Sequence, residues 1–310
     1  MAMAFGADTT TDEVLSGIDL SGKRYLVTGA SAGLGVETIR ALAAHGAEVV
    51  GTARDLDKAK AALAKAEVSG VDLVEVDLAD LASVRRGVDA IVAKGKKFDA
   101  IIGNAGVMAC PQGQTADGFE TQFGTNHLGH FVFVNRVASL LKSPGRVVML
   151  SSSGHRFSDV DLDDPDFART AYHPFVAYGR SKTANAQFAK GIDMRLQSRG
   201  VRGVAVHPGG IQTELGRHLS PDDIAQLRAA SSASGIKFKT IPAGAATSVW
   251  AATVAPADAI GGRFCQDCGV AAIDDSDARW GGVKSYAIDP EKADALWAKS
   301  EEMVGEQFRY

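Results

Sequence analysis

Short apolar runs alternate with longer amphipathic segments through the first two thirds of the chain. The runs are typical of buried strands, and we expect six strands, over residues 25–27, 48–52, 71–76, 98–102, 146–150 and 202–206. Between them, the spacing of apolar residues predicts helices over residues 36–45, 56–68, 81–94 and 176–199. Strands that alternate with helices indicate a parallel sheet with helices on both faces. The sequence therefore predicts an α/β protein with one doubly wound sheet.

The two ends of the chain follow this pattern less closely. Residues 1–20 form a polar arm, in which Thr11 is expected to cap a short helix over residues 12–16, and the arm is expected to lie at the periphery. Beyond residue 207 we expect helices over 221–230 and 243–252 and a last strand over 261–265. Because no linker or internal repeat divides the chain, residues 21–310 are predicted to form one domain.

Composition narrows the class of protein. The 310 residues include 34 glycines but only 9 prolines, which favours tight turns and close backbone approach over disorder. A net charge of −4 gives no reason to expect nucleic-acid binding, and three cysteines exclude a disulfide scaffold. The chain has neither an apolar run of membrane-spanning length nor a secretory signal pattern, so we expect no membrane span and a cytoplasmic location.

A glycine-rich turn follows the first predicted strand. Gly29 permits the turn, Gly33 lets the backbone approach a ligand, and Gly35 lets the next helix pack closely. A helix that begins there offers free N–H groups to a pyrophosphate, so the turn predicts a dinucleotide site of Rossmann type. Ser31 and Leu34 in the same turn are further candidate contacts. A tight turn without a ligand is the alternative.

The end of the second strand bears on the choice of cofactor. NAD enzymes usually place an acid there, whereas NADP enzymes prefer a cation for the 2′-phosphate. Ala53 takes the acid position and Arg54 follows, which favours NADP(H), with Ser31 as a second donor to the phosphate; NAD(H) is the runner-up. The alternative is that Arg54 is a solvated surface residue and Asp55 caps the next helix.

Polar residues gather where three further strands end. Asn104, Ser151–Ser153 and His207 follow the fourth, fifth and sixth strands, at the edge where ligands bind to parallel sheets. Tyr178 and Lys182 are four residues apart at the start of the long helix and so share one helix face. An ammonium beside a phenol lowers the pKa of the phenol, which makes Tyr178 a candidate acid/base, although such a spacing alone is more often a surface pair.

Taken together, these motifs resemble the short-chain dehydrogenase/reductase family. The resemblance rests on TGASAGLG, NAG, Asn126, the serine run, YGRSK and PGG, in family order, between about residues 20 and 213. The chain is also similar to the family's retinol-dehydrogenase and WW-domain-oxidoreductase-like branch, in the segments EVLSGIDLSGK, HLGHF, AYGRSKTANAQFA and FCQDCGVA.

The resemblance implies a role for each matching residue. Tyr178 would be the acid/base, Lys182 would lower its pKa and bind the nicotinamide ribose, Ser152 would hold the substrate oxygen, and Asn126 would hold a water next to Lys182. Ser151 and Ser153 leave the serine register open. The cofactor contacts implied are Asp77 and Leu78 at the adenine, Asn104, Ala105 and Gly106 at the adenosine ribose, and Pro208, Gly209, Ile211 and Thr213 at the nicotinamide half.

The chain departs from the family pattern in places that concern the substrate. Gly103 stands where the family often has a first asparagine, and an acidic insertion over about residues 156–174 precedes Tyr178. We interpret the insertion as a solvated loop or, alternatively, as a substrate-side flap. Residues 215–240 correspond to the family's substrate lid, whose apolar side chains either line the substrate or pack the lid: Leu215, Leu219, Ile224, Leu227, Ile236 and Phe238.

Three further features are interpreted as structural. Cys265 and Cys268 have CxxC spacing but no partner ligands, and His127 and His130 share a helix face without further metal ligands. Trp250, Trp280 and Trp297 are expected in the core or at an interface.

The sequence therefore predicts an NADP(H)-dependent oxidoreductase that interconverts an alcohol and its carbonyl, with an apolar small molecule as substrate. The same reaction with NAD(H), or a non-catalytic dinucleotide-binding regulator, are the alternatives. The family resemblance also allows a homodimer or homotetramer.

Overall fold

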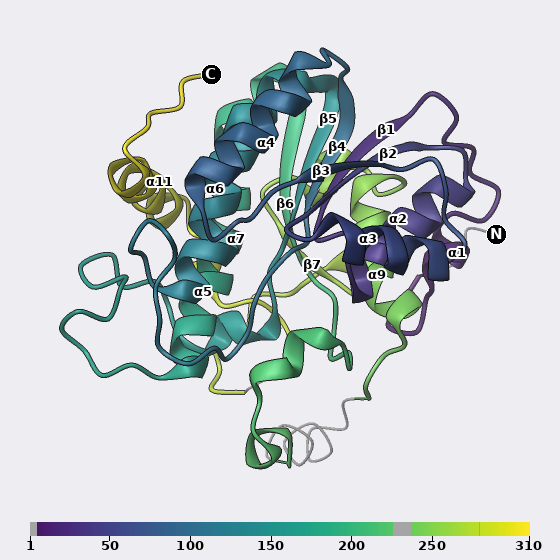
Figure 1. Cartoon of the computed structure of the whole chain (residues 1–310). Coiled ribbons are helices and arrows are strands. Elements are labelled where there is room, and N and C mark those ends of the chain that lie inside the picture. Colours follow the sequence, from purple (N-terminus) through teal and green to yellow (C-terminus); the bar gives the residue numbers. More distant parts are fainter. Residues whose placement is uncertain (1–4, 226–236, 279) are drawn as a thin grey trace.

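An eight-stranded sheet in the order β3-β2-β1-β4-β5-β6-β7-β8 forms the centre of the computed structural model, which describes residues 5–225, 237–278 and 280–310 (Figure 1). The strands are β1 (Arg24–Thr28), β2 (Glu48–Ala53), β3 (Asp72–Glu75), β4 (Phe98–Gly103), β5 (Leu141–Leu150), β6 (Val201–His207), β7 (Phe264–Gln266) and β8 (Gly269–Val270). The neighbours from β3 to β7 pair in parallel, and β8 pairs antiparallel with β7. The predicted doubly wound parallel sheet is confirmed, with an antiparallel edge that was not predicted.

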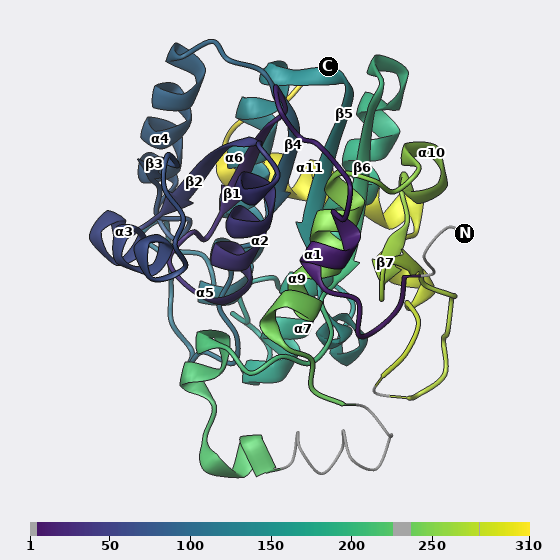
Figure 2. The same cartoon turned by 90° about the vertical axis from the view of Figure 1, so that its right-hand side faces the viewer.

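Helices cover both faces of this sheet (Figures 1 and 2). One layer contains α1 (Thr11–Val14), α2 (Gly33–Ala44), α3 (Leu56–Lys65) and α9 (Ile241–Ala252). The other contains α4 (Leu81–Ala93), α6 (Gly129–Val137), α7 (Pro174–Leu196) and α11 (Pro290–Val304). Two further helices, α5 (Thr121–Phe123) and α10 (Ala257–Ile260), are short. Residues 221–225 are helical, and the rest of the helix predicted over 221–230 lies outside the described residues.

Alternation along the strands divides the apolar core between the two layers. On β5, Val147 and Met149 join the α4, α6 and α7 side, whereas Val148 and Leu150 join the α2 and α9 side. All four side chains are buried, as is usual for a strand inside a parallel sheet. Trp250 and Trp297 lie in these two cores, as predicted.

The N-terminal arm is part of this packing rather than peripheral to it. Thr10, not Thr11, caps α1: its hydroxyl accepts from the Glu13 N–H, and the Glu13 carboxylate accepts from the Thr10 N–H. Thr11 is buried and donates to Glu37 of α2. Val14 and Leu15 are buried in the core on the α2 and α9 side. The prediction of a peripheral arm is therefore wrong for this segment, because its apolar residues complete one helical layer.

The order of the strands creates the crevice that matters for function. β1 pairs with β2 on one side and with β4 on the other, so the connections that leave β1 and β4 diverge. Ligands bind to open parallel sheets at such a point, outside the carboxyl ends of the strands. Among the described residues, no helix is long and apolar enough to cross a lipid bilayer.

Candidate active site

A cavity of about 740 Å³ lies along the carboxyl ends of β1, β2, β4, β5 and β6. Almost every residue predicted to bind the cofactor lines it: Gly29, Ser31, Gly33, Leu34, Arg54, Asp77, Leu78, Asn104, Ala105, Gly106, Pro208, Gly209, Ile211 and Thr213. Ser152, Tyr178 and Lys182 line it too. Gly35 lies beneath the turn, and Asn126 lies behind the lining.

The turn between β1 and α2 has the geometry of an anion site. Gly29 and Gly33 have φ values of +82° and +54°, which favour glycine. A Cβ on Gly35 would lie 2.0 Å from the carbonyl oxygen of Gly29, so the helix can approach the strand only with glycine there. Ala32 precedes α2 without a side-chain cap, so the N–H groups of the first turn are left for a ligand. These features fit the pyrophosphate of a dinucleotide.

Thr28 fixes the neighbouring loop after β4. Its hydroxyl oxygen accepts from the N–H groups of Asn104 and Ala105 at 2.9 and 3.0 Å, and the Asn104 amide donates to the Thr28 carbonyl at 2.8 Å. The loop is therefore held at a set distance from the glycine turn. Gly103 accommodates Met149, whose sulfur would lie 2.7 Å from a Cβ at that position, which explains why no side chain is present there.

Arg54 and Asp55, the two residues after β2 that bear on the choice of cofactor, have different roles in the structure. The Asp55 carboxylate accepts from the Lys58 N–H and caps α3, as the alternative interpretation predicted. Arg54 lines the crevice, and in the described part of the chain no carboxylate lies within ion-pair distance of it. Lys58 also lines the crevice and pairs with Glu214 at 2.6 Å. Arg54 is thus the cation available at this end.

Tyr178, Lys182 and Ser152 meet at the far end of the crevice. The Lys182 ammonium lies 5.7 Å from the centre of the Tyr178 ring and donates to the Leu150 carbonyl at 3.1 Å. Burial raises the pKa of Tyr178 to about 12, although a hydrogen bond with Ser152 opposes the rise, and burial lowers the pKa of Lys182 to about 8. The expected lowering of the Tyr178 pKa by Lys182 is therefore not seen, and desolvation of the phenol sets the direction of the shift.

The serines that follow β5 differ in what their hydroxyl groups contact. Ser151 is buried and donates to the Lys182 carbonyl at 2.7 Å, which is a structural bond. The Ser152 hydroxyl oxygen and the Tyr178 ring both lie within contact distance of a Cβ placed on Gly154. Ser152 therefore lies next to Tyr178; Ser153 also lines the crevice, and the substrate-holding role of Ser152 stays a prediction.

Asn126 does not reach the cavity. It is fully buried in a π-helical turn, Gly124–Leu128, and its amide donates to the Val107 carbonyl and to the Ser181 hydroxyl, both at 2.9 Å. Its side-chain oxygen accepts from the Val107 N–H at 2.8 Å. The side chain therefore ties the loop after β4 to α7. A Cβ on Gly106 would lie 3.0 Å from this oxygen and 3.4 Å from the Lys182 nitrogen, so Asn126 and Lys182 are near neighbours.

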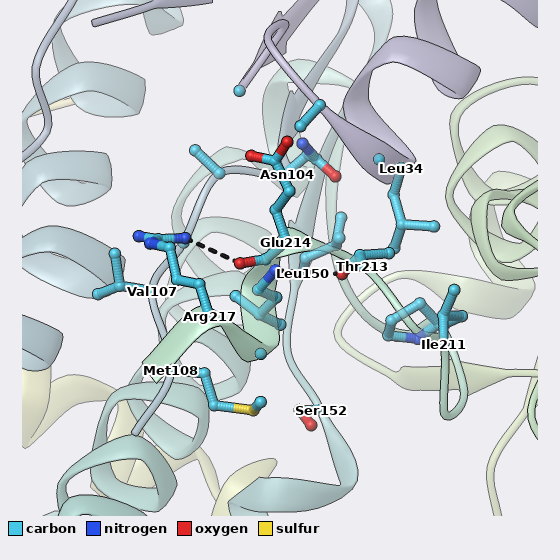
Figure 3. A pocket seen from close by; sticks show the side chains of 18 of the residues that line it. Leu34, Asn104, Val107, Met108, Leu150, Ser152, Ile211, Thr213, Glu214 and Arg217 are labelled. Carbon is cyan, nitrogen blue, oxygen red and sulfur yellow. Dashed lines mark hydrogen bonds between the residues drawn. The ribbon is translucent and has the colours of Figure 1, made fainter. Parts of the chain in front are cut away.

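The substrate half of the crevice has apolar walls. In Figure 3, Val107 and Met108 lie on one side of Ser152, and the predicted cofactor contacts Leu34 and Ile211 lie on the other. The remaining apolar residues of this half are Phe157, Phe175, Leu215, Leu219, Ile224, Phe238 and Trp280. The lid residues Leu215, Leu219, Ile224 and Phe238 thus line the crevice, and Leu227 and Ile236 lie outside the described residues.

Comparisons with known proteins agree with this geometry. The profile of the short chain dehydrogenases matches residues 23–224. Short-chain dehydrogenase/reductase prx1 of Penicillium roqueforti is 38% identical over 295 residues, which cover 92% of this chain and 86% of the relative. Retinol dehydrogenase 14 of Homo sapiens is 36% identical over 306 residues, which cover 92% of this chain and 87% of the relative. The chain belongs to the short-chain dehydrogenase/reductase family.

A solved structure of this family has the same fold. A short chain dehydrogenase from Burkholderia cenocepacia, in complex with NADP, superposes with a TM-score of 0.63 at 28% identity and covers 81% of this chain and 98% of its own. The predicted family is confirmed, with a retinol dehydrogenase among the relatives. The chain is therefore an oxidoreductase of the type that acts on CH–OH groups with a nicotinamide dinucleotide.

The acidic insertion before Tyr178 packs against α7 and the rest of the fold. Asp164 is buried, and its carboxylate accepts from the N–H groups of Ala168 and Thr170. Arg180 of α7 donates to the Asp164 carbonyl at 2.7 Å and lies 4.1 Å above the buried Phe167 ring. The interpretation as a solvated loop is wrong for these residues, because backbone and cation–π contacts hold them on α7.

Sequence reasoning missed the residues that the insertion brings to the crevice. Phe157 and Phe175, at its two ends, pack edge to face with ring centres 5.9 Å apart, and both line the cavity. Trp280 also lines it, so the prediction of a core or interface position is wrong for this tryptophan. No period or motif marks these positions; only the length of the insertion suggested that the substrate side was elaborated.

The cysteine and histidine pairs have structural surroundings. Cys265 and Cys268 are buried, and burial raises the pKa of their thiols to about 12 and about 11, which disfavours a reactive thiolate. His127 contacts Ser300 at 2.7 Å. Within the described ranges, no three His, Cys, Asp or Glu residues are arranged to hold a metal ion.

Proposed function

We propose that this protein is an NADP(H)-dependent oxidoreductase that interconverts an apolar alcohol and its carbonyl. The observation that carries the proposal is the single crevice, in which a glycine turn for a dinucleotide leads directly to Tyr178, Lys182 and Ser152. When bound, the nicotinamide gives or takes the hydride. The chain's own residues position the substrate and move the proton.

Proton transfer is assigned to Tyr178. Its raised pKa keeps the phenol protonated at neutral pH, so it can donate a proton to the carbonyl oxygen during reduction. Ser152 holds the same oxygen by a hydrogen bond, and Lys182 supplies positive charge beside the phenol. In the direction of oxidation, Tyr178 takes the proton from the alcohol, and this charge favours the phenolate that must form first.

NADP(H) is proposed over NAD(H) because of the end of β2. Ala53 stands at the acid position, Asp55 is occupied as a helix cap, and Arg54 lines the crevice. A relative in this family, the Burkholderia cenocepacia dehydrogenase, was solved with NADP. Ser31, on the neighbouring turn, is the proposed second donor to the 2′-phosphate.

The substrate is proposed to be apolar because of the walls around Ser152. Phe157, Phe175 and Met108 line the same crevice as Ser152 and Tyr178. An apolar substrate gains affinity from such walls, whereas a strongly polar one would lose its hydration without gaining partners.

A screen of apolar aldehydes, ketones and alcohols against both cofactors tests the proposal. We expect oxidation of NADPH with at least one apolar carbonyl, and slower or no oxidation of NADH. Tight NADPH binding without turnover of any compound would contradict the proposal and favour the alternative, a dinucleotide-binding regulator. A cytoplasmic location and a homodimer or homotetramer stay predictions.

A further inference from the structure

We propose that His130 is a positioning residue that links the cofactor half of the crevice to the segment that carries Tyr178 and Lys182. Its Nε2 lies 2.8 Å from the Thr28 hydroxyl oxygen on β1, and its Nδ1 lies 2.9 Å from the Asn126 carbonyl oxygen. The inference rests on the proposed function, because it concerns how the proposed catalytic residues are held.

The partners of His130 decide which ring nitrogen carries hydrogen. The Thr28 oxygen already accepts two backbone N–H groups, from Asn104 and Ala105, so its own hydrogen is free to point at His130 Nε2. The Asn126 carbonyl can only accept, so His130 Nδ1 must donate. Both bonds are satisfied only by the neutral Nδ1–H tautomer.

The surroundings of His130 keep the ring neutral. The side chain is fully buried, and burial lowers the pKa of His130 to about 4, against the opposing effect of the Asn126 carbonyl. The Lys182 ammonium on α7 lowers the pKa further. The other elements packed on His130 contribute the Thr28 hydroxyl from β1 and apolar or backbone atoms near Gly103 and Met149.

His130 therefore connects two groups of hydrogen bonds through the residue Asn126. Thr28 holds the loop of Asn104 beside the glycine turn. His130 forms hydrogen bonds with both the Thr28 hydroxyl and the Asn126 carbonyl. Asn126 then contacts Ser181, whose hydroxyl donates to the Tyr178 carbonyl at 2.8 Å. This path crosses the π-helical turn at Asn126, a rare irregularity that is frequent at functional sites.

His127 provides a matched control one turn earlier. It is equally buried and its pKa is also lowered by burial, to about 3. Its contacts are different: its Nε2 contacts Ser300 of α11, and its ring packs against Phe123, Phe131 and Phe188. Replacing His127 removes a buried imidazole of the same kind without touching the path from Thr28 to Tyr178.

Three substitutions separate the two bonds of His130. Leucine keeps neither bond, asparagine places an N–H near Nδ1 and can keep the bond to Asn126, and glutamine reaches the position of Nε2 and can keep the bond to Thr28. For His130→Leu we expect at least about a tenfold fall in kcat, with the Kd for NADPH changed less than about threefold. His130→Asn and His130→Gln should each recover about threefold or more of that loss, and His127→Leu should lower stability while leaving kcat unchanged.

Nitrogen-15 NMR of histidine-labelled protein tests the tautomer without any substrate. We expect His130 in the neutral Nδ1–H form at pH 7, both free and with NADPH bound. An Nε2–H tautomer, a charged ring at pH 7, or a kcat for His130→Leu equal to that of the wild type would each overturn the inference. Absence of turnover in the wild type would instead count against the proposed function, and the spectrum would still decide the tautomer.

Discussion

The two halves of the crevice are built in different ways. The cofactor half is shaped by main chain: left-handed glycines, the uncapped start of α2, and N–H groups held by Thr28. The substrate half is shaped by side chains that come from the stem of the insertion, the lid and the C-terminal segment. We infer that the cofactor half tolerates almost no change, whereas the substrate half can be altered with cofactor binding intact.

The largest expected effect is a methyl group added inside the cofactor half. In Gly35→Ala the new Cβ would lie 2.0 Å from the Gly29 carbonyl oxygen, and backbone cannot yield without displacing the turn. We expect the Kd for NADPH to rise at least about a hundredfold, which corresponds to the ~3 kcal/mol typical of overpacked sites. Fluorescence titration with NADPH measures it.

Gly210→Ala is the matched change in the loop after β6, on the side of that loop that faces the lid. There the new Cβ would meet only the Phe238 ring, at an ordinary contact distance of 3.6 Å. NADPH affinity should stay within about twofold of the wild type, which corresponds to less than ~0.5 kcal/mol. Equal losses in the two variants would contradict the difference between the halves.

Removing the cation at the end of β2 should change the choice of cofactor. For Arg54→Ala we expect the Kd for NADPH to rise about tenfold to a hundredfold, because a charge-assisted bond to the 2′-phosphate contributes ~1.5–3 kcal/mol. The Kd for NADH should stay the same, since NADH lacks that phosphate. Lys60→Ala, which removes a charge from α3 outside the crevice, is the control. A parallel loss for both cofactors would show that Arg54 does not bind the phosphate.

A smaller change is expected when the wall of the substrate half is opened. Phe175→Ala removes one ring of the pair at the stem of the insertion. The kcat/KM for an apolar carbonyl should fall about tenfold, in line with the ~1–3 kcal/mol that small changes in hydrophobic pockets contribute to discrimination. NADPH affinity should not change, and Ile273→Ala, at an exposed apolar position outside the crevice, should change neither quantity. An unchanged kcat/KM in Phe175→Ala would show that this ring does not form part of the substrate wall.

A last expected effect concerns the pH dependence of stability, to which buried histidines contribute. Burial lowers the pKa of both His130 and His155 to about 4, and His155 bonds the Ser152 carbonyl in the substrate half. Below pH 6.5 the unfolded chain binds protons that the folded chain does not, so stability falls as the pH falls from about 6.5 to about 4.

His155→Gln removes one of these two histidines and so measures its share of the pH dependence. The slope of the free energy of unfolding against pH, measured with urea between pH 4 and 6.5, should decrease by up to ~1.4 kcal/mol per pH unit. His218→Gln, at an exposed position, should leave the slope as it is in the wild type. An unaltered slope in His155→Gln would mean that this ring is not kept neutral by burial.

The sequence was informative where backbone geometry or a strand end carries the function. Gly35 and Arg54 occupy positions set by a strand, a turn and a helix, so their places in the crevice follow from local order. Phe157, Phe175 and Trp280 have no such rule, because they reach the crevice through tertiary packing of irregular segments. The two-residue β8 is likewise too short to leave a pattern.

Electrostatic surroundings were predicted less well than positions. The spacing of Tyr178 and Lys182 predicted that they share a helix face, and they do. It did not predict that burial would raise the pKa of Tyr178. Asn126 was predicted near Lys182, but its burial behind the cavity wall depends on contacts with Val107 and Ser181 that only the fold supplies. Desolvation depends on the whole surroundings of a group, which a motif does not contain.

The central claim, that one crevice holds NADPH and that Tyr178 transfers the proton, is tested most directly by Tyr178→Phe. The substitution removes only the hydroxyl, so turnover of an apolar carbonyl and NADPH affinity should be measured side by side in this variant and the wild type. We expect kcat to fall about a hundredfold or more, the scale of general acid catalysis, with the Kd for NADPH within about twofold of the wild type. Turnover that survives unchanged, with NADPH still bound, would contradict it.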